Sequence, residues 1–394
     1  MLMSSGKVGP ALADATVAGP HASERIAYLD TLRATLMLLG VVIHAAYVYV
    51  SSRSWLVASS VTSEFFDYLT LIIHAFRMPA FFLLSGFLFA LVLSRSATRP
   101  FMRSRFQRIV IPLVAVALVL NGAQLLAFGA LGPEYGSSAI NGNYCTSASA
   151  ILAGCWKIHL WFLVVLLYFF IIGWPIVRLL NKLPLWPVAG PGSNYWILTI
   201  ALMVTGGQAV SSLAGRGLFD FIFYLPFLSD RNFQYYLPFF CFGLLLNSCR
   251  ENLAHWQRVN FAAVAMFVAS WAVLLWWYDP SVSRASEFLR GGRYQLWLYY
   301  AVALQTSAFL VVLAARIPHP SQRFASYLSD TSYTVYLVHH LLVFAFALWL
   351  TNTQLAIGIQ FLVAVVVVSI LSWGFHHYVV ARNRFFAFWL NGRT

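Results

Sequence analysis

Long apolar segments recur along the whole chain and constrain the fold more than any other feature of the sequence. A helix needs about 20 mainly apolar residues to cross the hydrocarbon core of a bilayer. Ten segments meet this need, and they cover residues 27–50, 66–93, 108–130, 158–180, 195–214, 232–248, 259–277, 293–315, 329–350 and 356–380. Only 9% of the 394 residues are charged, too few for the surface of a water-soluble protein of this size. The sequence therefore predicts an all-α polytopic membrane protein with about ten transmembrane helices in a lipid bilayer.

The basic residues predict the orientation of these helices. The chain has 25 Lys and Arg residues against 12 Asp and Glu residues. In a membrane protein such an excess usually marks cytoplasmic loops, so we expect no nucleic-acid partner. If the N-terminus is cytoplasmic, most Lys and Arg residues fall on that side, including those of 95–108 and of 382–394. The positive-inside rule therefore predicts that both termini are cytoplasmic.

The same pattern divides the chain into one membrane domain and two tails. Residues 1–24 are rich in Ala, Gly, Ser and Pro and lack a continuous apolar run. This composition predicts a flexible N-terminal tail rather than a cleaved signal peptide. We expect residues 25–381 to form the membrane domain and residues 382–394 to form a basic cytoplasmic tail.

The cysteines leave one disulfide open. Cys145 and Cys155 both lie in the longest predicted outer loop, 131–157, where an oxidising compartment would permit a bridge. Two unpaired thiols fit the sequence equally well. No spacing of Cys and His residues resembles a zinc site, so we expect no metal.

The first apolar segment carries ionisable residues in a helical register. Arg33 and His44 are eleven residues apart, so they share one helix face with an axial offset of about 16 Å. Ionisable groups inside a bilayer are costly, so this face should turn toward protein or water. Imidazole suits general-base chemistry near neutral pH, and Asp30 can orient Arg33. The alternative is that Arg33 reaches the membrane surface and His44 only hydrogen-bonds a neighbouring helix.

The second apolar segment contains an arginine at a depth where a charge needs a partner. His74 and Arg77 are three residues apart and should share a face. Asp67 lies too far along the helix to pair with Arg77, so a ligand carboxylate or phosphate is a candidate partner. Ser85 and Gly86 are small enough for two helices to approach closely there, which favours packing over nucleophilic chemistry for Ser85.

Two further segments supply polar side chains at predicted helix starts. Arg105 and Arg108 are three residues apart and can act together on phosphates at the start of the third helix. Simple positive-inside topology explains their charge equally well. His159 and Trp161 open the fourth helix at the outer surface.

The ninth predicted helix contains two adjacent histidines. Ser329 or Asp330 can cap its start. His339 and His340 point about 100° apart on a helix, so we expect at most one of them to face a site.

Five sequence blocks occur in a fixed order between about residues 25 and 345. They are YLDTLRATLMLLGVVIH, HAFRMPAFFLLSGF, an arginine cluster before IP, HLWFLVVLL and YTVYLVHHLL. With these blocks the chain resembles the acyltransferase-3 family of integral membrane acyltransferases. The resemblance implies a membrane enzyme that takes an acyl group from cytoplasmic acyl-CoA.

The resemblance also implies roles for individual residues. Arg33 and His44 match the Arg-x10-His motif of the family, whose histidine is the catalytic one. Arg105 and Arg108 match its Arg-x-x-Arg motif, which is associated with the acyl-CoA donor. The expected catalytic residues are Asp30, Arg33 and His44. The expected substrate-binding residues are His74, Arg77, Ser85, Arg105, Arg108, His159, Trp161, Tyr336 and His340.

Arg77 directs the expectation toward one branch of the family, the succinyltransferases of osmoregulated periplasmic glucans. The implied reaction moves a succinyl group from cytoplasmic succinyl-CoA across the bacterial inner membrane to hydroxyls of a periplasmic glucan, with His44 as general base. Arg77 would pair with the free succinyl carboxylate. No cofactor is expected beyond succinyl-CoA as the donor substrate. Direct transfer is favoured, and an acyl-His44 intermediate stays open.

Two alternatives remain, and the oligomeric state is open. One is an acetyl-CoA-dependent O-acetyltransferase of another periplasmic polysaccharide. The other is a glycan transporter or flippase. Ion-coupled transporters commonly bury carboxylates near the middle of the membrane, whereas the 12 acidic residues here lie in loops or at helix ends. No internal repeat pair is visible either, which disfavours transport.

Overall fold

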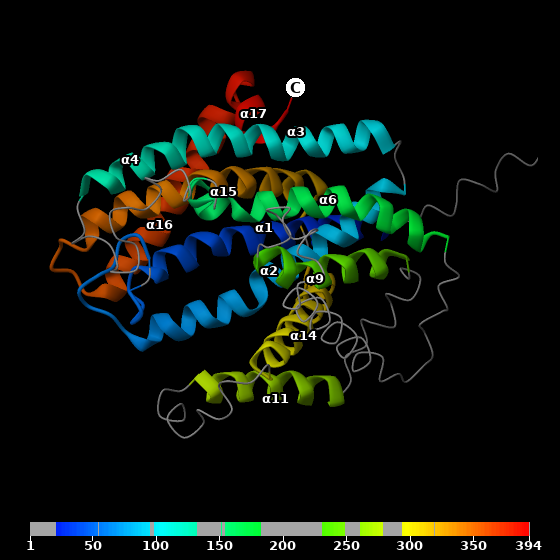
Figure 1. The fold of residues 1–394 in the computed structure, drawn as a ribbon, viewed down its shortest axis with the longest axis horizontal. Helices are drawn as coiled ribbons and strands as arrows, with labels where there is room; N and C mark the ends of the chain where they lie inside the picture. The colour runs from blue at the N-terminus through cyan, green and yellow to red at the C-terminus, as the bar shows by residue number, and fades with distance from the viewer. Residues whose placement is uncertain are drawn as a thin grey trace, which may run out of the picture.

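All regular elements that the structure describes are helices. The computed structural model describes residues 21–53, 55–94, 98–131, 151, 154–182, 231–248, 261–278, 294–318 and 320–393. The elements are α1 (His21–Tyr47), α2 (Glu64–Leu93), α3 (Thr98–Val116), the π-helical turn η1 (Ala117–Asn121), α4 (Gly122–Leu131), the 3₁₀ helix η3 (Cys155–Leu160), α6 (Trp161–Leu180), α9 (Arg231–Ser248), α11 (Phe261–Tyr278), α14 (Tyr294–Arg316), α15 (Gln322–Leu350), α16 (Ile357–Phe375), the π-helical turn η5 (His376–Val380) and α17 (Arg384–Asn391) (Figure 1).

Seven of the described helical stretches are long and apolar enough to cross a membrane. They are Ala27–Tyr47, Glu64–Leu93, Thr98–Ala130, Cys155–Leu180, Leu298–Arg316, Gln322–Leu350 and Ile357–Val380. A shorter apolar helix covers Val264–Tyr278, and α9 lies at the predicted span 232–248. The predicted span 195–214 lies outside the described residues. The protein is therefore a multi-pass membrane protein whose regular elements, within the described ranges, are helices. A total of ten membrane helices and cytoplasmic termini stay predictions.

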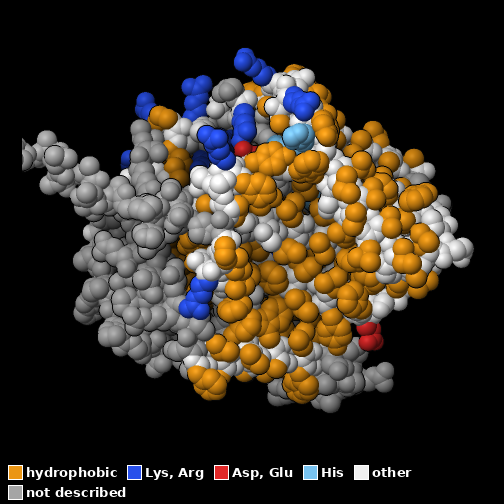
Figure 2. All heavy atoms as spheres, turned by 180° about the vertical axis from the view of Figure 1, so that it is seen from behind, with side chains coloured by type: hydrophobic (Ala, Val, Ile, Leu, Met, Phe, Trp, Pro, Cys, Tyr) orange, Lys and Arg blue, Asp and Glu red, His pale blue; other side chains and the backbone are white. Residues whose placement is uncertain are grey.

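The surface of the described helices agrees with a membrane setting. In Figure 2, most of the Lys and Arg side chains visible on that face gather at one end, and apolar side chains cover much of the rest. The last span shows how this surface arises, because it exposes large apolar side chains at intervals of three or four residues. These are Ile359, Leu362, Val366, Ile370 and Trp373. Such a stripe suits contact with lipid chains.

The centre of the bundle is formed by α1, α2 and α15. The first helix packs against both α2 and α15, and α15 also packs against α16. On its other side α2 packs against α9 and α14, and α14 in turn packs against α11 (Figure 1). The helices that carry the predicted site residues are thus neighbours in space.

The third helix starts earlier than predicted. The segment expected to begin at 108 is already helical from Thr98, because Pro100 in the first turn needs no hydrogen-bond acceptor for its nitrogen. Arg105 and Arg108 therefore lie inside the helix rather than at its start. Their backbone N–H groups belong to the helix ladder, so only their side chains are available to an anion.

The ninth predicted helix also starts earlier. Ser321 caps α15 by accepting a hydrogen bond from the Phe324 N–H at 3.4 Å. The prediction that Ser329 or Asp330 caps this helix is wrong, since both lie more than one turn inside it. Their side chains are instead free to reach other elements.

Cys155 is disulfide-bonded, as an oxidising compartment would permit. Its predicted partner Cys145 lies outside the described residues. Cys241 is a free thiol on α9. The predicted N-terminal tail also lies outside the described residues up to position 20.

Glycines allow α2 and α9 to touch through their backbones. A Cβ atom at Gly86 would lie 2.1 Å from the Phe240 carbonyl oxygen, and one at Gly243 would lie 2.0 Å from the Leu83 carbonyl oxygen. Backbone atoms cannot move aside as a flexible side chain can. The close approach of two helices expected at Gly86 is confirmed.

Gly243→Ala is expected to destabilise the fold by about 2 kcal/mol or more, because the new methyl group must push two packed helices apart. Gly374→Ala is the matched control, since a Cβ atom there meets nothing within 4 Å. Thermal unfolding in detergent measures both. Equal midpoints for the two variants would contradict the close crossing.

Candidate active site

A cavity lined by arginines opens at the end of the bundle where α1 begins. It encloses about 870 Å³ of space, including its open mouth. We call it the basic cavity. Its charged lining residues are Arg33, Arg105, Arg108, Asp330 and Arg393. Its deeper wall is apolar and includes Met37, Phe81, Leu88, Phe162, Leu166 and Phe170. The lining of the cavity therefore combines cationic side chains with large apolar ones.

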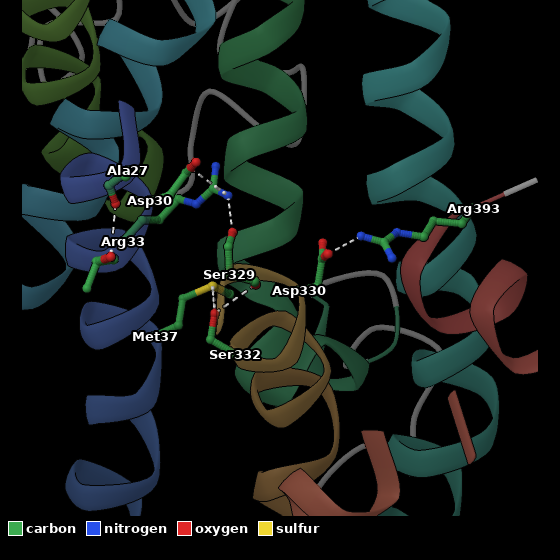
Figure 3. A network of polar contacts seen from close by, with 9 residues as sticks. Ala27, Asp30, Arg33, Met37, Ser329, Asp330, Ser332 and Arg393 are labelled. Carbon is green, nitrogen blue, oxygen red and sulfur yellow. Dashed lines mark hydrogen bonds and ion pairs between the residues drawn. The ribbon is translucent and has the colours of Figure 1, made fainter. Parts of the chain in front are cut away.

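Arg33 is held in place at the rim of this cavity (Figure 3). Asp30, one turn earlier on α1, pairs with its guanidinium at 3.5 Å. The same guanidinium donates a short hydrogen bond to the Ser329 hydroxyl of α15. These contacts orient the side chain from two helices, and the predicted pairing of Asp30 with Arg33 is present.

Arg105 and Arg108, the two arginines predicted to act on the donor, line this cavity together with Arg33. The charge of Arg105 is within electrostatic range of Arg33 and Arg108, and Arg105 lies over the Phe101 ring at 5.2 Å. Asp330 is the one carboxylate among the lining residues. Four arginines facing one carboxylate favour an anionic ligand.

A second group of polar side chains lies around the other end of α1. The histidine cluster consists of His44 on α1, His159 on η3, and His339 and His340 on α15. The His44 ring centre is 4.8 Å from that of His340 and 5.3 Å from that of His339. The His159 ring stacks on His340 at 4.8 Å and lies 5.6 Å from His339. Three separate segments of the chain, α1, η3 and α15, therefore meet in this cluster.

Hydrogen bonds orient two of these rings. His339 Nδ1 lies 2.7 Å from the Tyr336 carbonyl, which can only accept, so Nδ1 donates and Nε2 keeps its lone pair in the neutral ring. His340 Nδ1 donates to the Gln124 side-chain oxygen at 3.0 Å. Within the described part of the chain, His44 Nδ1 and both nitrogens of His159 have no hydrogen-bond partner. Hydrogen bonds to the described residues therefore do not fix the His44 Nδ1 atom.

The prediction that only one of His339 and His340 faces a site is wrong. Both are buried in the histidine cluster, with exposed fractions of 0% and 2%. The argument from angular spacing assumed that α15 has one facing side. This part of α15 is instead surrounded by other elements, so neighbouring positions both meet polar groups.

Arg77 lies beside the cluster, one turn closer to the basic cavity. Its Nη1 atom is 2.8 Å from the place where a Cβ atom at Gly40 would stand, and His339 Nε2 is 3.5 Å from that place. Gly40 precedes His44 by four residues, or about 6 Å along α1. Arg77 is buried, and it makes no hydrogen bond or ion pair with the residues that the structure describes. Three tyrosine hydroxyls, those of Tyr47, Tyr236 and Tyr336, lie within its electrostatic range.

One face of α1 joins the two groups. Arg33 and Met37 line the basic cavity, Gly40 meets Arg77, and His44 enters the histidine cluster. Steps of four, three and four residues keep these positions on the same side of a helix. The separation of about 16 Å between Arg33 and His44 suits an extended ligand with an anionic end.

Tyr336 and His159 connect α15 to the segment before α6. The Tyr336 hydroxyl donates to the His159 carbonyl at 2.7 Å. Ile158, with φ of 44°, turns the chain so that His159 enters the cluster. Trp161 stacks on Tyr236 at 5.6 Å and belongs to the packing around the site.

Trp55 is a site neighbour that sequence analysis missed. It lies in the loop between α1 and α2, and its ring centre is 5.4 Å from His340 and 6.3 Å from His44. Ser51 anchors the loop, since its N–H and its hydroxyl both donate to the Asp67 carboxylate. A loop residue has no periodic pattern around it, so only the general abundance of aromatics pointed to such a contact.

His74 and Ser85 do not join the histidine cluster. His74 is exposed on α2, although Arg77 three residues later is buried, because positions three apart still differ by about 60° around a helix. Ser85 lines the basic cavity instead. His74 and Arg77, which were expected to share a face of α2, therefore have different surroundings.

Known proteins match nearly all of the chain that carries these two groups. A family model described as an acyltransferase domain matches residues 26–376. Glucans biosynthesis protein C of Escherichia coli K12 is 26% identical over 358 residues, covering 84% of this chain and 86% of that protein. The proteins of that name from E. coli O157:H7 strain EC4115 and from strain UTI89 match with the same identity and coverage. No solved structure matches the chain.

Proposed function

Because the chain belongs to the acyltransferase-3 family, we propose that it moves a succinyl group from succinyl-CoA to hydroxyl groups of a periplasmic glucan. The observation that carries this proposal is the single face of α1 that joins a cationic cavity to a histidine cluster. An enzyme that transfers a group from a cytoplasmic donor to an acceptor outside needs a donor-binding site, a catalytic group that the acceptor can reach, and a path between them. Its place would be the bacterial inner membrane, with the basic cavity on the cytoplasmic side.

The basic cavity would bind the nucleotide end of the donor. Arg33, Arg105 and Arg108 would contact the phosphates of CoA, since guanidinium groups bind phosphate oxygens through two parallel hydrogen bonds. The pantetheine arm would then pass the apolar wall near Met37 and Phe81. The thioester would arrive beside His44.

His44 would act as the general base. It would take the proton of a sugar hydroxyl while the hydroxyl oxygen attacks the thioester carbonyl. Collapse of the tetrahedral species breaks the carbon–sulfur bond. The departing sulfur takes the proton back from His44 and leaves as the thiol of CoA. The products are a glucan ester and free CoA. No other group is needed to balance this step.

Arg77 would select succinyl over acetyl groups. Arg77 reaches from α2 to Gly40, which precedes His44 by about 6 Å along α1. This offset suits the short chain between the succinyl thioester carbonyl and the free carboxylate. A buried guanidinium that lacks an anionic partner among the described residues is suited to that carboxylate. The glucan as acceptor is supported by the printed name of the E. coli relatives.

Replacing both Arg105 and Arg108 by glutamine is expected to weaken CoA binding about 10- to 100-fold, because two charge-assisted contacts are lost. Arg103→Gln is the matched control, since Arg103 is exposed on the same helix and does not line the cavity. Equilibrium binding of CoA to the purified protein measures the effect. Equal affinities in the double variant and the control would place the donor elsewhere.

The function is tested with purified protein, a β-glucan, and either succinyl-CoA or acetyl-CoA. Release of free CoA and a gain in glucan mass report the transfer. We expect succinyl ester from succinyl-CoA and little product from acetyl-CoA. Efficient transfer from acetyl-CoA alone would favour an O-acetyltransferase, and no transfer from either donor would reject the proposed reaction.

A further inference from the structure

The C-terminal helix α17 brings one more arginine to the basic cavity. This helix follows the last span and packs against α3 (Figure 1). Asn383 caps its start by accepting a hydrogen bond from the Phe385 N–H at 2.9 Å. Gly392 ends it with φ of 60°, a left-handed conformation that glycine adopts readily.

The residues after α17 are held against two helices. A Cβ atom at Gly392 would lie 2.5 Å from the Gln107 carbonyl oxygen and 2.6 Å from the Arg108 Cα atom, so only glycine lets the chain pass α3 this closely. Asn391 is buried and accepts a hydrogen bond from the Thr334 hydroxyl of α15 at 3.1 Å. Arg393 therefore starts from a fixed backbone position beside the cavity.

Arg393 pairs with Asp330 at the cavity (Figure 3). Both side chains line the cavity and remain partly open, with exposed fractions of 44% and 32%. This pair neutralises one of the four arginines of the basic cavity. The guanidinium fork that binds a carboxylate also fits a phosphate, so an incoming phosphate can compete with Asp330 for Arg393.

We propose that Arg393 is a donor-binding residue, which contacts a phosphate of CoA and exchanges Asp330 for that phosphate when the donor binds. This inference rests on the proposed function, because it assumes that the basic cavity binds the donor. It assigns the C-terminal segment to the donor site, although the segment follows the last membrane span.

A purely structural role for the Arg393–Asp330 pair gives the opposite expectation for one variant. If the pair only pinned α17, Arg393→Gln and Asp330→Asn would break the same contact and weaken CoA binding alike. If Arg393 binds the donor, Arg393→Gln removes a phosphate contact. Asp330→Asn then leaves that contact in place and removes a carboxylate of the cavity lining that repels the phosphates.

The test is the dissociation constant of CoA for the purified full-length protein and three variants. Arg384→Gln is the charge-matched control, because Arg384 is exposed on α17 and does not line the cavity. We expect Arg393→Gln to weaken binding about tenfold, Arg384→Gln to leave it unchanged, and Asp330→Asn to keep or tighten it.

Two results would overturn the assignment of Arg393 while leaving the donor site intact. One is equal affinity in Arg393→Gln and Arg384→Gln, and the other is equal weakening in Arg393→Gln and Asp330→Asn. No binding of CoA to the wild type would overturn the proposed function itself, and Arg393 with it. If Arg393→Gln fails to fold, Asp330→Asn decides alone, since weakened binding in that variant contradicts the proposal.

Discussion

Replacing His44 by alanine is expected to lower the rate constant of acyl transfer by about 10²- to 10⁴-fold, the usual contribution of a positioned general base. His44 is the member of the histidine cluster that lies on the same face of α1 as Arg33, which lines the basic cavity. Its Nδ1 atom has no partner within the described part of the chain. The rate of CoA release in the presence of a β-glucan measures the loss.

Affinity for CoA separates a chemical role of His44 from a structural one. The basic cavity lies about 16 Å away along α1, so His44→Ala should bind CoA as the wild type does. His377→Ala serves as control, because His377 contacts Tyr327 and lies outside the cluster. Transfer by His44→Ala at the wild-type rate would contradict the assigned role and leave His44 as a packing residue.

Arg77→Gln is expected to lower succinyl transfer by about 10²-fold while acetyl transfer changes by only a few-fold, because only the succinyl group carries a carboxylate. Competition between succinyl-CoA and acetyl-CoA measures the ratio directly. Gly40→Ala provides an independent check, since its new methyl group would lie only 2.8 Å from Arg77 Nη1 and would push the guanidinium away. It should shift the donor ratio in the same direction.

A uniform loss of transfer from both donors would contradict this role of Arg77. In that case the guanidinium would serve the architecture of the histidine cluster rather than donor choice. Thermal unfolding of each variant separates the two cases, because a structural role predicts a lowered midpoint together with the uniform loss.

The membrane class and one face of the site could be predicted from sequence because both rest on periodicity. Apolar runs of sufficient length predict spans whatever their neighbours are. The spacing of Arg33 and His44 fixes their shared face once α1 is helical, and Arg33 and Met37 on that face do line the cavity. Spacing alone made Arg105 and Arg108 candidate phosphate contacts, and the resemblance to the acyltransferase-3 family associated them with the acyl-CoA donor. No local rule places them beside α1.

The missed residues depend on contacts between segments distant in sequence. Trp55 reaches His44 from a loop, and Arg393 pairs with Asp330, 63 positions earlier. Nothing near either residue in the sequence encodes these partners. The predicted helix starts were wrong for a different reason, since α3 and α15 begin before their apolar segments, in more polar stretches of sequence.

His339 illustrates how burial overrides angular reasoning. Two adjacent helical positions face different directions, but a helix surrounded on most sides presents both to other protein groups. The sequence could not show that η3 and α1 would both pack near the same turn of α15. A histidine pair in an apolar run predicts a polar cluster but not which ring belongs to it.

The central claim is that donor and acceptor meet through one face of α1 from opposite sides of the membrane. Proteoliposomes with a β-glucan trapped inside and succinyl-CoA added outside test it most directly, with His44→Ala in parallel. The proposed function predicts that trapped glucan gains succinyl esters only with wild-type protein. Esters that form only when both substrates are on the same side of the membrane would contradict it.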